Sequence, residues 1–192
     1  MQNRPDHRSN VFISKKMSYC LRHNPDKYGL KLDEFTYGNL ITTAQLCGIH
    51  LVAVKSDKEG MQAEDLLHVC QVNDIKRIYL MSEYSNPTGK VISPTRRKQL
   101  ADIIEKQNLI VIEDDYLSFL SRKKPAHPLK MMQWYHCYIC SMSKVIASGL
   151  RVGYLIYPDK YSSEIRNGFF NTMVKTSSLD TAVVTEAINT HS

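Results

Sequence analysis

From residue 40 onward the chain alternates between apolar runs of strand length and segments with helical spacing. Five runs rich in β-branched, aromatic or other apolar residues have the length and composition of strands, and they cover residues 50–55, 77–81, 109–113, 136–141 and 151–157. Strands that are separated by helices pair in parallel through crossover connections. We therefore predict an α/β fold with a mostly parallel open sheet that is flanked by helices on both faces.

Helical spacing lies between these strands. Asn39–Cys47 forms one predicted helix, which ends at Gly48, and Met61–Gln71 forms a second. The clearest helix start is Ser93-Pro94, where a capping hydroxyl precedes proline at the first helical position. This third helix is predicted to run to about residue 107.

The composition fits one globular core. The chain has 192 residues, of which 43% are hydrophobic, so it can bury one substantial core. It has no apolar run long enough to span a membrane, and its polar first ten residues do not resemble a secretory signal. The five scattered cysteines fit reduced thiols in a cytoplasmic protein better than a disulfide framework.

The net charge of +6 is spread along the chain rather than gathered in a stripe. Two short basic clusters, residues 96–98 and 122–124, are predicted to be a solvated helix face and a loop, so nucleic-acid binding is not predicted for this chain alone.

Cys137 and Cys140 form a CxxC pair, but residues three apart in a strand point to opposite faces. Because no second ligand pair follows, we predict no metal site.

Polar and ionisable residues follow three of the predicted strands: Asn86, Asp114, Tyr116, Ser141 and Lys144. In open α/β sheets, ligands bind beyond the carboxyl ends of the strands. We therefore expect these side chains to gather at one edge of the sheet and to form a binding site there.

Lys144 stands in the segment SMSKVIASGLRVGYL, directly after an apolar strand and seven residues before Arg151. A lysine in a partly desolvated site near other cations has a lowered pKa and can form a Schiff base. Ser141 and Arg151 could bind a phosphate through a hydroxyl and a guanidinium group.

Asp114 leaves a buried strand and needs a partner, which could be a helix N-terminus, a surface cation or the protonated nitrogen of a pyridine ring. Asp115 is expected to face away and to be structural. Tyr116 and Asn86 could each donate a hydrogen bond to a ring oxygen, although a tyrosine in core packing and an NPTG turn are equally ordinary.

Three segments, in this order and spacing, resemble class I/II aminotransferases of fold type I, which depend on pyridoxal 5′-phosphate (PLP): YSNPTGKVISPTRRKQL, VIEDDYLSF and SMSKVIASGLRVGYLIYP. The EDDY form and the spacing from lysine to arginine are most similar to the aminotransferase-type domain of MocR-like transcription regulators. The resemblance implies that Thr36–Ser192 is a partial PLP-binding large domain.

The resemblance also implies the roles of single residues. Lys144 would form the aldimine with PLP, Asp114 would pair with the pyridine nitrogen, and Ser141 and Arg151 would hold the phosphate. The phenolic oxygen would bind to Tyr116 and Asn86, and Tyr37 would stack on the ring. The chain departs from the family pattern at Phe35 and Ser148, where the family usually has proline, and both changes alter loop stiffness rather than chemistry.

Residues 1–35 are predicted to be a separate, short helical segment. The stretch SKKMSYCLRHNPDKYGLKLDE resembles the opening of the NAD-dependent RNA 2′-phosphotransferase family, in which Arg22 and His23 would belong to the catalytic set. The alternative is a basic amphipathic helix with His23 near its C-terminal end. We also expect the phosphate-binding turn upstream of Tyr37 and the small C-terminal domain of the aminotransferases to be absent.

These patterns lead to one main functional hypothesis and three alternatives. The main hypothesis is a PLP-dependent aminotransferase-like protein that takes an amino acid and a 2-oxo acid, with Lys144 as the catalytic residue and a homodimer as its assembly. The alternatives are a ligand-sensing domain of a MocR-like regulator, a non-functional fragment and an RNA 2′-phosphotransferase.

Overall fold

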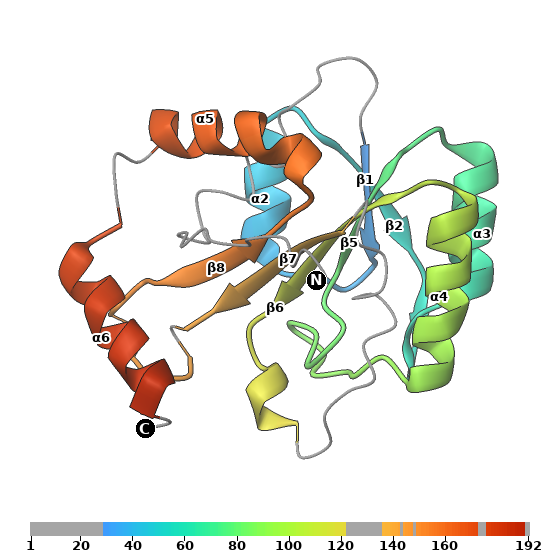
Figure 1. Cartoon of the computed structure of the whole chain (residues 1–192). Helices are drawn as coiled ribbons and strands as arrows, with labels where there is room; N and C mark the ends of the chain where they lie inside the picture. The colour runs from blue at the N-terminus through green and yellow to red at the C-terminus, as the bar shows by residue number, and fades with distance from the viewer. Residues whose placement is uncertain (1–28, 122–135, 143, 148, 173–175, 191–192) are drawn as a thin grey trace, which may run out of the picture.

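A six-stranded sheet lies at the centre of the computed structural model, which describes residues 29–121, 136–142, 144–147, 149–172 and 176–190 (Figure 1). The strand order is β2-β1-β5-β6-β7-β8. The bounds of these strands are, in chain order, β1 Gly29–Asp33, β2 His50–Val54, β5 Arg77–Leu80, β6 Ile110–Asp115, β7 His136–Ser141 and β8 Gly153–Ile156. All neighbouring strands pair in parallel except β7 and β8, which are antiparallel.

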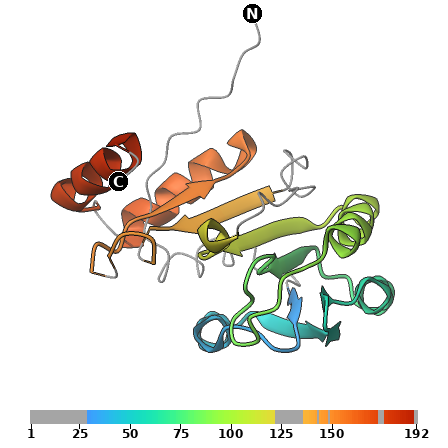
Figure 2. The ribbon, with the colours of Figure 1, turned by 90° about the horizontal axis from the view of Figure 1, so that it is seen from below.

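Helices cover both faces of the sheet. The α-helices of the described residues are α2 Gly38–Leu46, α3 Ala63–Val72, α4 Pro94–Lys106, α5 Ser162–Thr172 and α6 Ser178–Thr190. One core cluster contains Leu40 of α2 and Ile165 of α5, and the opposite cluster contains residues of α3 and α4, including Leu66 and Leu100. Figure 2 shows α2 and α3 on opposite sides of the sheet, with α6 at the end next to β8.

These observations confirm the predicted fold class and most of the predicted elements. The start of α4 is as expected: Ser93 Oγ accepts a hydrogen bond from the backbone N–H of Arg96 at 3.2 Å, and Pro94 occupies the first helical position. A short hairpin of β3 (Ser56–Asp57) and β4 (Gly60–Met61), which the sequence pattern does not predict, precedes α3.

The strand β1 lies within residues 1–35, for which the sequence predicts a separate, short helical segment. It pairs with β2 along its whole length and with β5 through Lys31 and Ile78, so residues 29–33 are part of the same sheet. The side chain of Lys31 is 1% exposed, and its ammonium group donates a hydrogen bond to the carbonyl of Ile75. The helix proposed around Arg22 and His23 lies outside the described residues.

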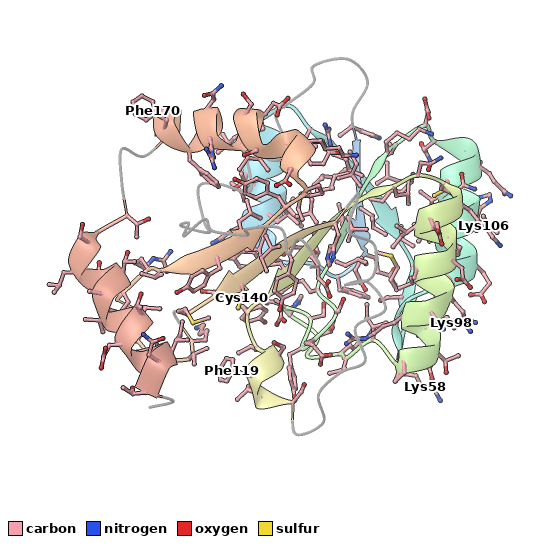
Figure 3. All side chains as sticks on the ribbon, in the orientation of Figure 1. Lys58, Lys98, Lys106, Phe119, Cys140 and Phe170 are labelled. Carbon is pink, nitrogen blue, oxygen red and sulfur yellow. The ribbon has the colours of Figure 1, made fainter. Side chains whose placement is uncertain are left out.

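The basic cluster at residues 96–98 is only partly solvated, which corrects the prediction of a solvated helix face. Arg96 and Arg97 are buried, because α4 turns them toward the hairpin and the loop after β5. The carboxylates of Asp57 and Glu83 pair with them. Lys98 and Lys106 lie on the outer side of α4, as Figure 3 shows.

The strand order reverses between β1 and β5. From β1 the chain crosses to β2 on one side, and it then returns past β1 to β5 on the other side. In doubly wound sheets, this change of direction opens a crevice beyond the carboxyl ends of the strands. The segments after β1, β5, β6 and β7 therefore converge on one edge of the sheet.

Candidate functional site

Asp114 lies near the carboxyl end of β6 and is 6% exposed. Its Oδ2 accepts a hydrogen bond from the Tyr79 hydroxyl at 2.8 Å. Burial raises the pKa of Asp114 to about 6; the charge of Asp115 also raises it, and the hydrogen bond from Tyr79 opposes this rise. Asp114 is thus a buried carboxylate with a raised pKa that still lies below neutral pH, so the ionised form is the major one at pH 7. Within the described residues, Tyr79 is the side chain that donates a hydrogen bond to Asp114.

Asp115 has the structural role that the sequence predicted. It is 3% exposed and accepts hydrogen bonds from the Tyr138 hydroxyl and from the backbone N–H of Ser118. Because neighbouring residues of a strand point to opposite faces, the two adjacent carboxylates have different partners. Asp115 fixes the chain as it leaves β6 and enters the 3₁₀ turn at Ser118–Leu120.

Two tyrosines pack beside this carboxylate. Tyr116 and Tyr37 are half-buried and contact the core cluster that contains Tyr79. The Tyr116 hydroxyl donates to the carbonyl of Tyr84 at 3.0 Å, and the Tyr37 hydroxyl accepts from the side-chain amide of Asn39 at 2.7 Å. Burial and the charge of Asp114 raise the pKa of Tyr116, so its hydroxyl remains a hydrogen-bond donor.

Asn86 lies in the loop that follows β5 and is half-buried. Arg97 of α4 binds this loop. Its guanidinium group donates to the carbonyls of Ser82 and Ile92, each at 2.9 Å, and forms a buried ion pair with Glu83. The hydrogen bond from Tyr116 to Tyr84 joins the same loop to the end of β6. Asn86 is therefore held at the edge that also carries Asp114.

Ser141, Lys144 and Arg151 lie in or beside one connection, which joins β7 to β8 at the same edge of the sheet. The backbone N–H of Met142 donates to the carbonyl of Val152 at 3.0 Å and closes the base of this connection. Lys144 and Arg151 are exposed, whereas the sequence predicted partial burial for Lys144. The reason is that Lys144 lies in a turn beyond the end of β7, outside both core clusters.

The structure thus brings Tyr37, Asp114 and Tyr116 together. The other candidates lie at the same edge, Ser141 at the end of β7 and the rest on loops. Within the described residues, no hydrogen bond or ion pair joins Lys144 to Asp114. Beside Tyr79, a small pocket lies at the change of direction between β1 and β5, and its walls include Asp33, Thr36, Tyr79, Ser85 and Lys90.

Two residues of this site were not predicted from the sequence: Tyr79 and Arg97. Tyr79 appears only as one more apolar residue in a short strand, and Arg97 as part of a basic cluster. The available signal for Tyr79 was its hydroxyl, because a tyrosine at a fully buried position needs a hydrogen-bond partner. Which residue accepts the hydrogen bond from Tyr79 depends on the register of β5 against β6, and the local sequence does not predict that register.

Strand β7 carries the CxxC pair of the sequence. Cys137 is buried in the core and Cys140 is half-buried, and both lie in β7. In the described ranges, no group of three or more His, Cys, Asp or Glu side chains is arranged to hold a metal ion. The helices of the same ranges are too short or too polar to cross a membrane.

Known proteins match this chain over most of its length. The family described as aminotransferase class I and II matches residues 17–191. The HTH-type transcriptional regulator YdeF of Bacillus subtilis is 34% identical over 154 residues, which are 80% of this chain and 33% of the regulator. An aromatic amino acid aminotransferase of Schizosaccharomyces pombe is 30% identical over 169 residues, which cover 72% of this chain and 35% of that enzyme. The chain therefore spans about a third of the length of these relatives.

Solved structures show the same fold. The multiple substrate aminotransferase of Thermococcus profundus superposes with a TM-score of 0.85 at 19% identity, over 94% of this chain and 47% of that one. The α-aminoadipate aminotransferase LysN of Thermus thermophilus, complexed with N-(5′-phosphopyridoxyl)-L-leucine, gives 0.83 at 21% identity, over 92% and 47%. From the family match and the shared sheet, we conclude that the chain belongs to the aminotransferase class I and II family.

Proposed function

We propose that this chain is the cofactor-binding part of a PLP-dependent aminotransferase, which transfers an amino group between an amino acid and a 2-oxo acid. The observation that carries this proposal is Asp114, a buried carboxylate at the carboxyl end of β6 whose Oδ2 is held by the Tyr79 hydroxyl. Its second oxygen, Oδ1, would then accept a hydrogen bond from a ligand. A buried charge of this kind costs stability unless a ligand compensates it, and a protonated pyridine nitrogen is a suitable ligand.

The residues at the sheet edge fit the rest of the cofactor. Tyr37 would lie against the ring. The Asn86 amide would donate to the phenolic oxygen, and the Tyr116 hydroxyl would do so by exchanging its bond to the Tyr84 carbonyl for one to that oxygen. Ser141 and Arg151 would bind the phosphate with a hydroxyl and a guanidinium group. When bound, PLP supplies an electron-accepting ring that weakens the bonds to the α-carbon of an amino acid.

The residues of this chain would then perform two tasks. Asp114 would hold a proton on the pyridine nitrogen, because a carboxylate favours the charged form of the ring. Lys144 Nζ would attach the cofactor and, once released, would move the proton at the α-carbon of the substrate. The exposed position of Lys144 allows an amino acid to reach the amine from solvent.

A second candidate function is supported by the similarity to the regulator YdeF. In that case the same site would bind PLP and an amino acid in order to sense the amino acid, and a separate DNA-binding region would give the response. Both versions of the proposal place the protein in the cytoplasm as a homodimer, with small-molecule amino acids and oxo acids as ligands.

Absorbance spectroscopy of the purified full chain with PLP tests the proposal. We expect a visible band that differs from that of free PLP and that is lost in Lys144→Ala. Lys98→Ala is the matched control, because Lys98 is an exposed lysine on the outer side of α4. The loss of the band in both variants, or in neither, would contradict the role of Lys144.

Addition of single amino acids to the PLP-loaded chain separates the two functions. An aminotransferase converts bound PLP to pyridoxamine phosphate and releases an oxo acid, which can be measured by chromatography. A sensor shows a change in the spectrum or in thermal stability without release of an oxo acid. A chain that binds PLP but responds to no amino acid in either assay would contradict both functions.

A further inference from the structure

Tyr79 and Asp114 come from neighbouring strands and share one face of the sheet. Tyr79 of β5 is directly opposite Ile112 of β6, and Asp114 lies two residues further along β6. Because side chains alternate along a strand, Ile112 and Asp114 point to the same face, and a long side chain such as tyrosine can reach the diagonal position. The register therefore brings the Tyr79 hydroxyl to 2.8 Å from Asp114 Oδ2.

The contact is enclosed by protein. Tyr79 is 1% exposed and Asp114 is 6% exposed, so water does not compete freely for either group. The ionisable groups that act on the pair are Asp115 on the same strand, Tyr116 at the end of β6 and Tyr37 before α2. Burial and the charge of Asp114 raise the pKa of Tyr79 well above its ordinary value, so its hydroxyl stays protonated and can act only as the donor in this bond.

We propose that Tyr79 is a positioning residue for Asp114: its hydroxyl fixes Oδ2 and the ionised state of the carboxylate, so that Oδ1 is presented to a positively charged N–H donor at the sheet edge. This inference rests on the proposed function for the identity of that donor, the pyridine nitrogen of PLP. The hydrogen bond itself does not depend on the cofactor.

The geometry gives Tyr79 two effects. A carboxylate that accepts a strong bond at one oxygen cannot rotate freely, so the direction of the second oxygen is fixed. A hydrogen bond to the charged form also favours ionisation, and it opposes the burial that favours protonation. Without the hydroxyl, Asp114 would be protonated in a larger share of molecules at neutral pH and would bind a pyridinium ion less well.

The test is Tyr79→Phe in the full chain, with Tyr138→Phe as the matched control. Both changes remove one tyrosine hydroxyl from an aspartate of β6, but Tyr138 bonds to Asp115 rather than to Asp114. Carbon-13 NMR of aspartate carboxyl groups without cofactor follows the titration of Asp114, assigned with Asp114→Asn. We expect the midpoint to rise by roughly one pH unit in Tyr79→Phe and to move far less in Tyr138→Phe. Equal midpoints in Tyr79→Phe and the unchanged chain would overturn the proposal.

A second measurement does not need Tyr79→Phe to fold. In the unchanged chain, the Cζ resonance of Tyr79 should shift with the same midpoint as the Asp114 carboxyl, and this shift should vanish in Asp114→Asn. A Tyr79 resonance that does not respond to the ionisation of Asp114 would contradict the contact.

PLP binding then connects the contact to the proposed function. We expect the dissociation constant of PLP, measured by absorbance, to rise about twofold at pH 7 and about tenfold at pH 5 in Tyr79→Phe and not in Tyr138→Phe. The reason is that a midpoint raised by about one pH unit roughly halves the ionised share of Asp114 at pH 7 and lowers it about tenfold at pH 5. If the unchanged chain binds no PLP, the proposed function fails, and the NMR titration alone decides whether Tyr79 positions Asp114. PLP binding that is equal in the three proteins would overturn the role of Tyr79 toward the cofactor.

Discussion

At the scale of single residues, the burial of the Asp114 carboxylate lowers the stability of the folded chain. Folding raises its pKa from the ordinary value of 3.8 to about 6, mainly because the carboxylate loses its water. The ionised form is therefore less favourable in the folded than in the unfolded chain. Such a penalty is typical of binding sites, where a group is held ready for a ligand.

We predict that Asp114→Asn stabilises the cofactor-free chain above pH 7. Because folding raises the pKa of Asp114, the contribution of this group to the free energy of unfolding falls as the pH rises from 3.8 to about 6 and then stays constant. The rise in pKa corresponds to a loss of about 3 kcal/mol. Asparagine carries no charge, so the gain should approach this size at pH 8 and vanish below pH 4. Urea unfolding at both pH values measures it.

Asp115→Asn is the matched control for this prediction. Its carboxylate accepts hydrogen bonds from Tyr138 and Ser118, so we expect no gain in stability at pH 8. A gain for Asp114→Asn that is the same at pH 4 and pH 8 would show that burial of the charge is not its cause.

At the scale of elements, α4 and the loop after β5 are joined by one buried ion pair. Arg97 is 2% exposed, and its guanidinium group pairs with Glu83 and donates to two loop carbonyls. The same loop carries Asn86. Helix packing and the position of a candidate ligand residue therefore depend on the same side chain.

We predict that Arg97→Met destabilises the chain by about 3 to 5 kcal/mol, because it leaves the carboxylate of Glu83 buried without its partner. The adjacent Lys98→Met, on the exposed side of α4, should change the free energy of unfolding by less than about 0.5 kcal/mol. The double variant Arg97→Met with Glu83→Gln should recover part of the loss. Urea unfolding measures all three, and a loss for Arg97→Met no larger than that for Lys98→Met would contradict the anchor.

The sequence predicts elements whose signals are local and misses those whose partners are distant. The cap at Ser93 and the apolar runs of β6 and β7 are local, and these elements lie where the sequence predicts them. The strand β1 was missed because Lys31 places a charge at a buried position, where the carbonyl of Ile75 accepts a hydrogen bond from its ammonium group. The contact of Tyr79 with Asp114 was missed because it depends on the register of two strands that are far apart in the sequence.

At the scale of the whole molecule, the order of the strands explains why the candidate residues gather at one edge. The carboxyl ends of β1, β5, β6 and β7 lie side by side, because these strands are parallel neighbours, and the strand order changes direction between β1 and β5. Every candidate residue lies on or after one of these ends, or at the end of the connection from β7 to β8. The aminotransferase of Thermococcus profundus has this fold at 19% identity. The fold therefore depends on the pattern of buried positions more than on particular residues.

The most direct test of the account is to find which lysine carries PLP. The full chain is incubated with PLP, reduced with borohydride, digested and mapped by mass spectrometry. We predict that the phosphopyridoxyl group is found mainly on Lys144, and that Asp114→Ala lowers its yield there while Asp115→Ala lowers it much less. Labelling spread over exposed lysines such as Lys58, Lys98 and Lys106, with no preference for Lys144 and no effect of Asp114, would contradict the assignment of this sheet edge as the cofactor site.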